Sequence, residues 1–344
     1  MHGRHIIGML YGSAAQGRQD GFCGNQGNPG ACGQVKVVSF FSGLGGLDKG
    51  FLDTGYEIIW ANDFDKFAVQ TYRANFGAHM VLGDINEIPL AEIPDGDVMI
   101  GGFPCQPFSM MGHQKGFEDA RGTLFFRIAQ ILQDKIEKGR KPRAVILENV
   151  RSLKTHDKGN TYREIHRILE QELGYHVFCE ILNSADYGVP QTRNRTYIVC
   201  FDEEVAYAFP PKQELDRTLQ DLLEPEVDQK YFLSDKILPT ILSGGTGGYR
   251  AKSEIDLKIA RPLCATMAKM HRACQDNYVT QNGRIRRLTP RECARLQGFE
   301  DSFVIPVSDC QAYKQFGNAV TVNVARAVAQ SVKDTLQGMG AWTE

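Results

Sequence analysis

An apolar run that leads directly into a glycine-rich turn narrows the fold of this chain more than any other feature. Residues 35–41 (Val-Lys-Val-Val-Ser-Phe-Phe) are apolar and β-branched, as buried strands are, and Ser-Gly-Leu-Gly-Gly follows at 42–46. Leu47, Phe51 and Leu52 then have the spacing of a helix. A strand, a glycine turn and a helix in this order form the first unit of a nucleotide-binding α/β fold. A glycine-rich turn alone is weak evidence for a ligand.

The next two predicted strands both end in an acidic residue. The strand at 57–61 leads to Asp63 and Phe64, about twenty residues beyond the turn, where such folds hold ribose hydroxyls. Phe64 has a ring that can stack on a purine, and the alternative interpretation of Asp63 is an N-cap for the following helix. The strand at 79–82 leads to Asp84, whose carboxylate can accept a hydrogen bond from an adenine amino group.

These three turns indicate an adenosine cofactor. No lysine follows a glycine loop as in triphosphate-binding loops, and the turn is shorter than the G-x-G-x-x-G dinucleotide fingerprint. We therefore expect S-adenosylmethionine rather than NAD, because S-adenosylmethionine has no pyrophosphate to bind.

A cysteine between two prolines follows the fourth predicted strand. The apolar run 97–100 leads into Gly-Gly-Phe-Pro-Cys-Gln-Pro-Phe-Ser at 101–109, and the prolines restrict the backbone on both sides of Cys105. Open α/β sheets bind ligands at the carboxyl ends of their strands, so a rigidly held sulfur there suits a nucleophile. A lone cysteine is more often a buried structural residue. The polar segment 110–121 predicts either a loop that closes over a substrate or an ordinary surface loop.

One glutamate and two arginines favour the interpretation of Cys105 as a nucleophile over that of a structural cysteine. Glu148 follows the near-continuous apolar strand 144–147, where burial raises the pKa of a carboxyl and lets it hold a proton near neutral pH. The alternative is a salt-bridged or capping glutamate. Arg193 and Arg195 occupy alternate positions between two further strands, so they face the same side if the segment is extended. The alternative for the arginines is a solvated basic edge.

The alternation of strands and helices stops after Phe201. Residues 202–285 mix proline, glycine and charge, and we expect them to form a smaller second domain, with 35–201 as the first domain and 286–344 returning to it. Between 229 and 291 there are twelve basic and four acidic residues, although the net charge of the chain is -2. Such a local excess is typical of surfaces that bind nucleic-acid phosphates, and a solvated basic face is the alternative.

The ends of the chain and the cysteines complete these expectations. Residues 1–34 show no periodicity and predict either a flexible leader or a translated extension outside the fold. The nine cysteines form no C-x-x-C pair, so no metal site is expected, and no signal or membrane-spanning run is present, which indicates a cytoplasmic protein. Residues 288–298 predict a helix capped by Thr289, and a turn at 317–318 is expected to lead into a last helix ending near residue 336.

Six motifs together resemble the DNA cytosine-5 methyltransferases of bacterial restriction–modification systems. They occur in the family's order: Phe-Ser-Gly-Leu-Gly-Gly (41–46), Pro-Cys (104–105), Glu-Asn-Val (148–150), Gln-Thr-Arg-Asn-Arg (191–195), Arg-Leu-Thr-Pro-Arg-Glu-Cys-Ala-Arg-Leu-Gln-Gly-Phe (287–299) and Gln-Phe-Gly-Asn-Ala-Val (315–320). The resemblance implies a Rossmann-like α/β methyltransferase domain, with a mostly parallel sheet and helices on both faces. It also implies a target-recognition domain at 202–285.

The resemblance further implies S-adenosylmethionine as cofactor, S-adenosylhomocysteine as its product and double-stranded DNA as partner. In this family a cysteine adds to carbon 6 of a flipped-out cytosine while carbon 5 receives the methyl group. The catalytic residues would be Cys105, Glu148, Arg193 and Arg195. The residues around the cofactor would be Phe41, Gly43, Leu44, Gly46, Asp63, Phe64, Asp84, Ile85, Pro104, Leu124, Asn318 and Val320. A monomer is expected, with a cognate restriction endonuclease as a possible partner.

An alternative and two departures qualify the resemblance. A tRNA cytosine-5 methyltransferase of the same superfamily shares the cysteine, glutamate and arginine set, and the long 202–285 segment favours DNA. Ser39 stands where the family often has aspartate, so a hydrogen bond on the cofactor side is expected to differ. Pro262-Leu263 stands where a Thr-Leu pair is common, which puts that threonine's contact to DNA in question. The hypothesis for sequence readout is two loops, at 243–249 and 267–277.

Overall fold

The computed structural model describes residues 34–104, 124–243 and 254–342. The predictions for the leader up to residue 33, for Cys105 and the loop after it, and for most of the glycine-rich patch at 243–249 therefore fall outside the described residues. Within the described residues, no helix has the length and apolar character that a membrane crossing requires.

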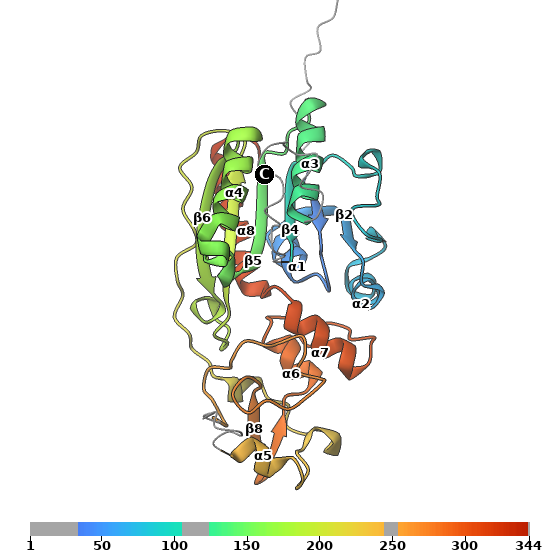
Figure 1. Cartoon of the computed structure of the whole chain (residues 1–344), viewed down its shortest axis with the longest axis vertical. Coiled ribbons are helices and arrows are strands. Elements are labelled where there is room, and N and C mark those ends of the chain that lie inside the picture. Colours follow the sequence, from blue (N-terminus) through green and yellow to red (C-terminus); the bar gives the residue numbers. More distant parts are fainter. Residues whose placement is uncertain (1–33, 105–123, 244–253, 343–344) are drawn as a thin grey trace, which may run out of the picture. The chain divides into compact units, whose positions relative to one another are not determined.

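The larger of the two sheets among the described residues has seven strands (Figure 1). Its strand order is β3-β2-β1-β4-β5-β7-β6, in which β7 alone runs opposite to the other six strands. The mostly parallel sheet that the resemblance implies is thus confirmed. The strands are β1 (Lys36–Phe40), β2 (Glu57–Asp63), β3 (Met80–Leu82), β4 (Val98–Gly102), β5 (Ala144–Val150), β6 (His176–Asn183) and β7 (Asn194–Phe201).

Helices cover both faces of the sheet, as predicted. The side chains of one face pack against α1 (Gly46–Leu52), α2 (Lys66–Phe76) and α8 (Val322–Gly338). Those of the other face pack against α3 (Leu124–Glu137) and α4 (Asn160–Arg167). Burial of each such Val, Leu, Ile or Phe side chain contributes about 1.5–3 kcal/mol.

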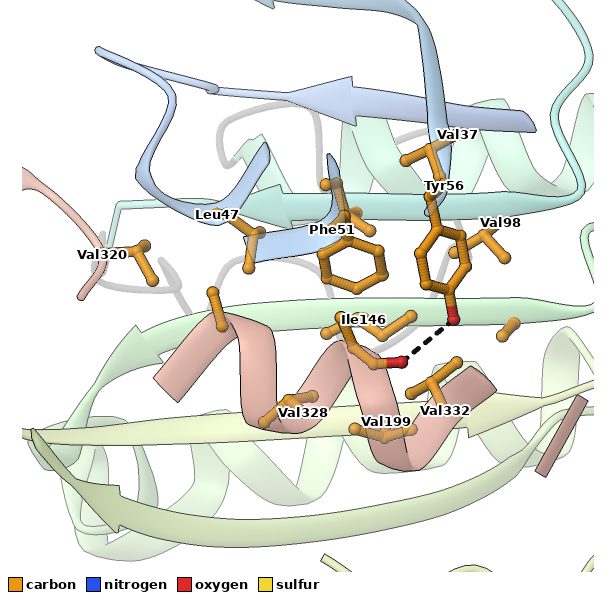
Figure 2. Close-up of a cluster of buried hydrophobic side chains, with 14 of the residues drawn as sticks. Val37, Leu47, Phe51, Tyr56, Val98, Ile146, Val199, Val320, Val328 and Val332 are labelled. Carbon is orange, nitrogen blue, oxygen red and sulfur yellow. Dashed lines mark hydrogen bonds between the residues drawn. The ribbon is translucent and has the colours of Figure 1, made fainter. Parts of the chain in front are cut away.

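The first of these apolar layers is drawn in Figure 2. Val328 and Val332 of α8 lie over Ile146 and Val199 of the sheet. The Tyr56 hydroxyl donates to a backbone carbonyl of the same helix, that of residue 329, at 3.1 Å. This bond satisfies the one polar atom that Tyr56 brings into the layer.

Two glycines of α1 allow its backbone to touch the C-terminal part of the chain. A Cβ built on Gly46 would lie 2.3 Å from the Val320 carbonyl oxygen, and one on Gly50 would lie 2.5 Å from the Ala325 Cβ. No side chain fits at either position. The last glycine of the turn at 42–46 therefore serves helix packing, as in other nucleotide-binding folds.

Residues beyond β7 build a third apolar cluster. Leu219, Leu222, Leu263 and Val279 share it with side chains of α6 (Pro290–Arg295) and α7 (Asp309–Asn318). A hairpin of β8 (Tyr278–Gln281) and β9 (Arg284–Arg287) continues this region, and α5 (Leu238–Leu242) lies in it as well. The boundary expected at residue 285 falls inside β9, so the hairpin joins the two segments that this boundary was meant to separate.

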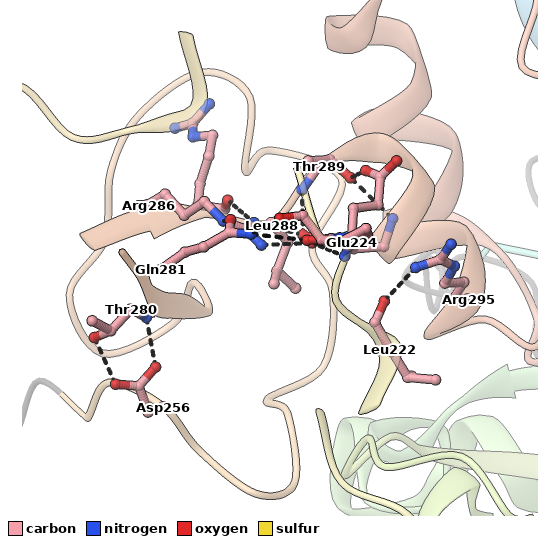
Figure 3. A network of polar contacts seen from close by, with 12 residues as sticks. Leu222, Glu224, Asp256, Thr280, Gln281, Arg286, Leu288, Thr289 and Arg295 are labelled. Carbon is pink, nitrogen blue, oxygen red and sulfur yellow. Dashed lines mark hydrogen bonds and ion pairs between the residues drawn. The ribbon is translucent and has the colours of Figure 1, made fainter. Parts of the chain in front are cut away.

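A buried ion pair connects the hairpin to α6. The Arg286 guanidinium donates to both carboxylate oxygens of Glu292, at 2.8 and 2.7 Å, and both side chains are fully buried. Glu292 also accepts the backbone N–H groups of Glu224 and Thr289, each at 2.8 Å. Figure 3 shows Gln281 of β8 reaching the same network, where its Oε1 accepts from Arg286 at 2.6 Å.

Three local predictions are settled by the helix ends. The N-cap role of Thr289 is confirmed, since its hydroxyl accepts the Glu292 N–H at 3.1 Å. The N-cap role of Asp63 is wrong, because β2 includes Asp63 and the cap of α2 is Asp65, which accepts from the N–H of Phe67.

The prediction of a turn at 317–318 is also wrong, because α7 continues through Asn318. A Cβ on Gly317 would lie 2.2 Å from the backbone nitrogen of Ala265. Glycine is required there because another backbone approaches the helix, and not because the chain turns.

Candidate active site

Most of the expected site residues that the structure describes lie at one edge of the sheet, where the strand order reverses. β1 pairs with β2 on one side and with β4 on the other, so the connections diverge between β1 and β4. The register aligns Phe40 with both Asn62 and Gly101, and Gly102 with Glu148. The carboxyl ends of β1, β2 and β4 therefore lie side by side with β5. Such a switch point is where open α/β sheets bind ligands.

The glycine turn after β1 leaves open space above its backbone. Phe41 and Gly43 both have positive φ angles, of 53° and 58°. The Gly43 N–H donates to Asp63 Oδ2 at 2.9 Å, which ties the turn to the end of β2. A Cβ added to Gly43 would meet no atom of the described residues within 4 Å. A ligand can therefore approach this backbone closely, as the predicted cofactor requires.

The ends of β2 and β3 present two carboxylates and one exposed aromatic ring. Asp63 is buried, and burial raises its pKa although backbone N–H groups donate to both oxygens. A carboxylate has about four acceptor positions, so Asp63 keeps the capacity for a further hydrogen bond. Phe64 is 72% exposed, an unusual state for a phenylalanine. Asp84 is exposed, and one of its oxygens accepts two hydrogen bonds from Asn86 while Ile85 beside it is buried.

Glu148 is a buried carboxyl inside β5, whereas the sequence predicted it just beyond the strand. It pairs with Gly102 on one side and Tyr197 of β7 on the other, and this antiparallel pairing extends β5 to Val150. A Cβ on Gly102 would lie 3.3 Å from Glu148 Oε2, so glycine leaves room for the carboxyl group. Burial raises the pKa of Glu148, and the charges of Arg195 and Arg193 oppose that rise.

The two arginines have different partners. Arg195 Nε lies 3.2 Å from Glu148 Oε1, and the Arg195 side chain is 20% exposed. Arg193 is fully buried, and its guanidinium donates to the carbonyls of Leu263, Gly317 and Ala319 at 2.7–3.0 Å. Burial lowers the pKa of Arg193 to about 9, which leaves it charged at neutral pH. Its Nε has no hydrogen-bond partner among the described residues.

Two residues inside the motifs support the site and were missed by sequence reasoning. Asn149 donates to the Phe103 carbonyl at 2.7 Å and so holds the end of β4, two positions before Cys105. Gln191 donates to the carbonyl of Leu296 at 2.6 Å and accepts from the N–H of Leu263 at 2.9 Å. Their positions in Glu-Asn-Val and Gln-Thr-Arg-Asn-Arg were the available signal.

The remaining predicted residues lie around the same edge or in the packing beneath it. Pro104 is exposed and is the last described residue before Cys105, and half-buried Leu124 is the first after the gap. Asn318 is exposed at the end of α7. Leu44 is buried in the third apolar cluster, and Val320 packs on the first one.

Ser39, which stands where the family often has aspartate, is hydrogen-bonded to a carboxylate from α1. The Ser39 hydroxyl donates to Asp48 Oδ1 at 2.6 Å, and the Tyr72 hydroxyl donates to Asp48 Oδ2 at 2.7 Å. Asp48 is fully buried, and burial raises its pKa to about 6 against these two hydrogen bonds. A carboxylate thus lies beneath the glycine turn, although the strand itself carries a serine.

The sequence matches one protein-family model along most of its length. The model describes a C-5 cytosine-specific DNA methylase and matches residues 35–334. The Type II methyltransferase M.NlaX of Neisseria lactamica is 42% identical over 319 residues, which cover 88% of this chain and 98% of that protein. The Type II methyltransferase M.HhaI of Haemophilus parahaemolyticus is 37% identical over 320 residues, with 88% and 95% covered.

Solved structures agree with this fold. A methyltransferase of Entamoeba histolytica, EhMeth, superposes with a TM-score of 0.70 at 20% identity and covers 88% of this chain and 98% of its own. The Dnmt2 methyltransferase of S. pombe gives a TM-score of 0.69 at 20% identity, with 89% and 99% covered.

Proposed function

The chain belongs to the C-5 cytosine-specific DNA methylase family, and from this premise we propose how its residues carry out the reaction. It is a DNA cytosine-5-methyltransferase, related to the methyltransferases of Type II restriction–modification systems. We propose that it methylates carbon 5 of a flipped-out cytosine in a short duplex sequence, with S-adenosylmethionine as methyl donor. The observation that supports this most strongly is the Glu148–Arg195 pair beside Gly102, at the edge that carries the open glycine turn.

The residues at the ends of β1, β2 and β3 fit an adenosine cofactor. Asp63 would accept hydrogen bonds from the ribose hydroxyls through its remaining lone pairs, and the exposed Phe64 ring would stack on the adenine. Asp84 would accept from the adenine amino group. When bound, S-adenosylmethionine supplies an electrophilic methyl group on its sulfonium sulfur.

Cys105 would act as the nucleophile on the cytosine ring. Its thiolate forms a bond to carbon 6, and the electron pair of the 5,6 double bond moves to carbon 5, which then takes the methyl group. The proton on carbon 5 leaves to a base, the 5,6 double bond forms again, and Cys105 departs as a thiolate. Carbon 6 is inaccessible in a stacked duplex, so the base must be flipped out at a cost of a few kcal/mol.

Glu148 and Arg195 would stabilise the charge that this addition creates. Attack by the thiolate pushes negative charge toward N3 and O2 of the ring. A Glu148 carboxyl that holds a proton donates it in a hydrogen bond to N3, and burial favours that protonated form. The partly exposed Arg195 guanidinium donates to O2. Both groups are held in place by their own contact before the substrate arrives.

Arg193 and Asn149 would position these groups. We propose that Arg193 supports the backbone and does not contact the substrate. Its guanidinium already donates to three backbone carbonyls, those of residues 263, 317 and 319. Asn149 fixes the strand end that leads to Cys105. Residues 202–285 would read the DNA sequence, with 267–277 as one reading loop.

The test begins with the target sequence. Bisulfite sequencing of plasmid DNA from cells that express the protein identifies the methylated cytosine and its context. A duplex with this sequence, and tRNA in parallel, are then incubated with S-adenosylmethionine carrying a labelled methyl group. We expect label in the duplex only, and label confined to tRNA would overturn the proposal.

The role of Cys105 is tested with a matched cysteine control. Cys105→Ala is expected to lose methyl transfer and keep S-adenosylhomocysteine binding. Cys310→Ala, which removes an exposed free cysteine at the start of α7, is expected to retain both. A duplex with 5-fluorocytosine at the target should leave the protein covalently attached, because fluorine cannot depart as the proton does. Transfer by Cys105→Ala would remove Cys105 from this role.

A further inference from the structure

A row of hydrogen-bonded side chains leads from the glycine turn into the interior. The Ser42 and Ser39 hydroxyl oxygens lie 2.8 Å apart, and Ser39 donates to Asp48 at 2.6 Å. Tyr72 donates to the other Asp48 oxygen at 2.7 Å, and its own oxygen lies 3.0 Å from His79 Nε2. Ser42 reaches the surface of the turn with 9% of its area exposed, whereas Asp48 is fully buried.

The carboxylate fixes the direction of the hydrogen bonds that Ser39 and Tyr72 make to it. An ionised Asp48 can only accept, so the single hydroxyl proton of Ser39 must point to it. The Ser39 oxygen can then only accept from Ser42, whose own single proton is used in turn; the backbone carbonyl of Ser39, at 3.4 Å, is the other acceptor within reach. In either case the Ser42 proton points inward. The Ser42 oxygen therefore has no proton left to donate to a ligand and can offer a ligand lone pairs only.

Burial of this carboxylate is costly, and no cation offsets it. Among the described residues, no lysine or arginine forms an ion pair with Asp48. An apolar side chain of similar size would remove the cost of desolvation. Two hydroxyl donors and the position of Asp48 in the first turn of α1 offset part of this cost. The remaining question is what the charge does at the surface of the turn.

The strand order places this turn under a particular part of the cofactor. In the proposed function the adenosine part of the cofactor would bind at β2 and β3, while its reacting methyl group would have to reach β4 and β5, where Glu148 lies. β1 lies between them, so the cofactor passes over the turn at 41–46. The methionine end carries an ammonium group, which donates hydrogen bonds and needs acceptors.

We propose that Asp48 is a positioning residue for the cofactor, which acts through Ser39 to fix the Ser42 hydroxyl as an acceptor for the methionine ammonium group. This inference rests on the proposed function, because it takes S-adenosylmethionine as the ligand of the glycine turn. It assigns to Asp48 the electrostatic role that a strand carboxylate at position 39 would otherwise have.

The test compares two ligands that differ only at the amino-acid end. S-adenosylhomocysteine carries the ammonium group, whereas 5′-methylthioadenosine keeps the adenosine and the thioether without it. Asp48→Asn retains the shape but adds an N–H donor, which allows the row to reverse. Asp48→Asn and Ser42→Ala are each expected to weaken S-adenosylhomocysteine binding about tenfold by calorimetry, and to change 5′-methylthioadenosine binding less than about twofold. The double variant should lose no more than either single variant.

Thr71→Val is the matched control, since it removes another buried hydroxyl, which donates to Gln315 at 2.9 Å outside this row. It should leave both dissociation constants unchanged. Equal weakening of both ligands in Asp48→Asn, or no weakening of either, would overturn the proposal. If the Asp48 variant does not fold, the same comparison of the two ligands with Ser42→Ala tests the proposal. A wild-type protein that binds neither ligand would refute the proposed cofactor instead.

Discussion

Glu292→Gln is expected to loosen the hairpin of β8 and β9 by about 4 kcal/mol. Glu292 accepts four N–H groups on two oxygens, two from Arg286 and one each from the backbone of Glu224 and Thr289. A glutamine has one acceptor oxygen, so two of the four donors lose their acceptor. Each buried donor left without one costs about 1–3 kcal/mol.

The unpaired charge of Arg286 gives a second estimate of this loss of free energy. Arg286 and Glu292 both have no exposed side-chain area, so the variant leaves an uncompensated guanidinium in the interior. Removing one partner of such a buried pair costs about 3–5 kcal/mol. The count of hydrogen bonds and the charge argument describe the same loss and agree in size.

The assay is hydrogen exchange of the backbone amides at 278–287, followed by mass spectrometry. A loss of about 4 kcal/mol corresponds to exchange about a thousandfold faster where local opening limits it. Tryptophan fluorescence, from Trp60 in β2 and from Trp342 on the first apolar cluster, reports in parallel whether the sheet itself has been destabilised.

Asp301→Asn is the matched control. Arg295 and Asp301 also form a two-bond pair, with both contacts at 2.7 Å, but Asp301 is 63% exposed. Such a surface pair contributes less than about 1 kcal/mol. Acceleration below about tenfold in Glu292→Gln, or equal acceleration in the two variants, would refute the reasoning from burial.

Three further predictions concern the site. In Gly102→Ala the added methyl group would lie 3.3 Å from Glu148 Oε2 and displace the carboxyl group. We expect methyl transfer to fall about a hundredfold while the melting temperature stays unchanged, and an unchanged rate of transfer would contradict this prediction. Asn149→Ala leaves the Phe103 carbonyl without its donor, and we expect a loss of about 1 kcal/mol in urea unfolding together with weaker transfer; full activity would exclude a positioning role. Asp48 has a pKa near 6 when folded against an ordinary 3.8, so its ionisation costs stability above that pH and not below about pH 4. Asp48→Asn should therefore gain up to about 3 kcal/mol relative to wild type between about pH 4 and about pH 7, and a difference that does not change with pH would contradict this.

The strands and their order along the chain were predictable because each is a short apolar run bounded by turn residues. Their ends were not, because pairing with a neighbour decides them. Glu148 lies within β5 since the antiparallel partner β7 continues alongside it, and no local pattern indicates this. The hairpin of β8 and β9 was missed although Asn282-Gly283, both with positive φ, is a strong signal for a two-residue hairpin turn.

The supporting residues of the site could be located by motif but not assigned a partner. Arg193 and Arg195 look equivalent in sequence, yet the first holds backbone carbonyls and the second contacts Glu148. Asp48 appears as an ordinary polar residue of a short helix, and its burial follows only from the packing of α1. Long-range partners of this kind depend on the tertiary fold and leave no periodic trace.

The third apolar cluster limits how a new DNA specificity could be grafted onto this scaffold. Leu219, Leu263 and Val279 are packed against α6 and α7, so these helices and the segment before them form one hydrophobic interior. A chimera cut at residue 285 would split a strand pair and expose that interior. An exchange that carries residues 202–318 as a single block keeps the strand pair and most of this interior together, and leaves its contacts with Leu44, Ala319 and Val322 to be matched. Recombination between relatives should therefore favour breakpoints outside this block.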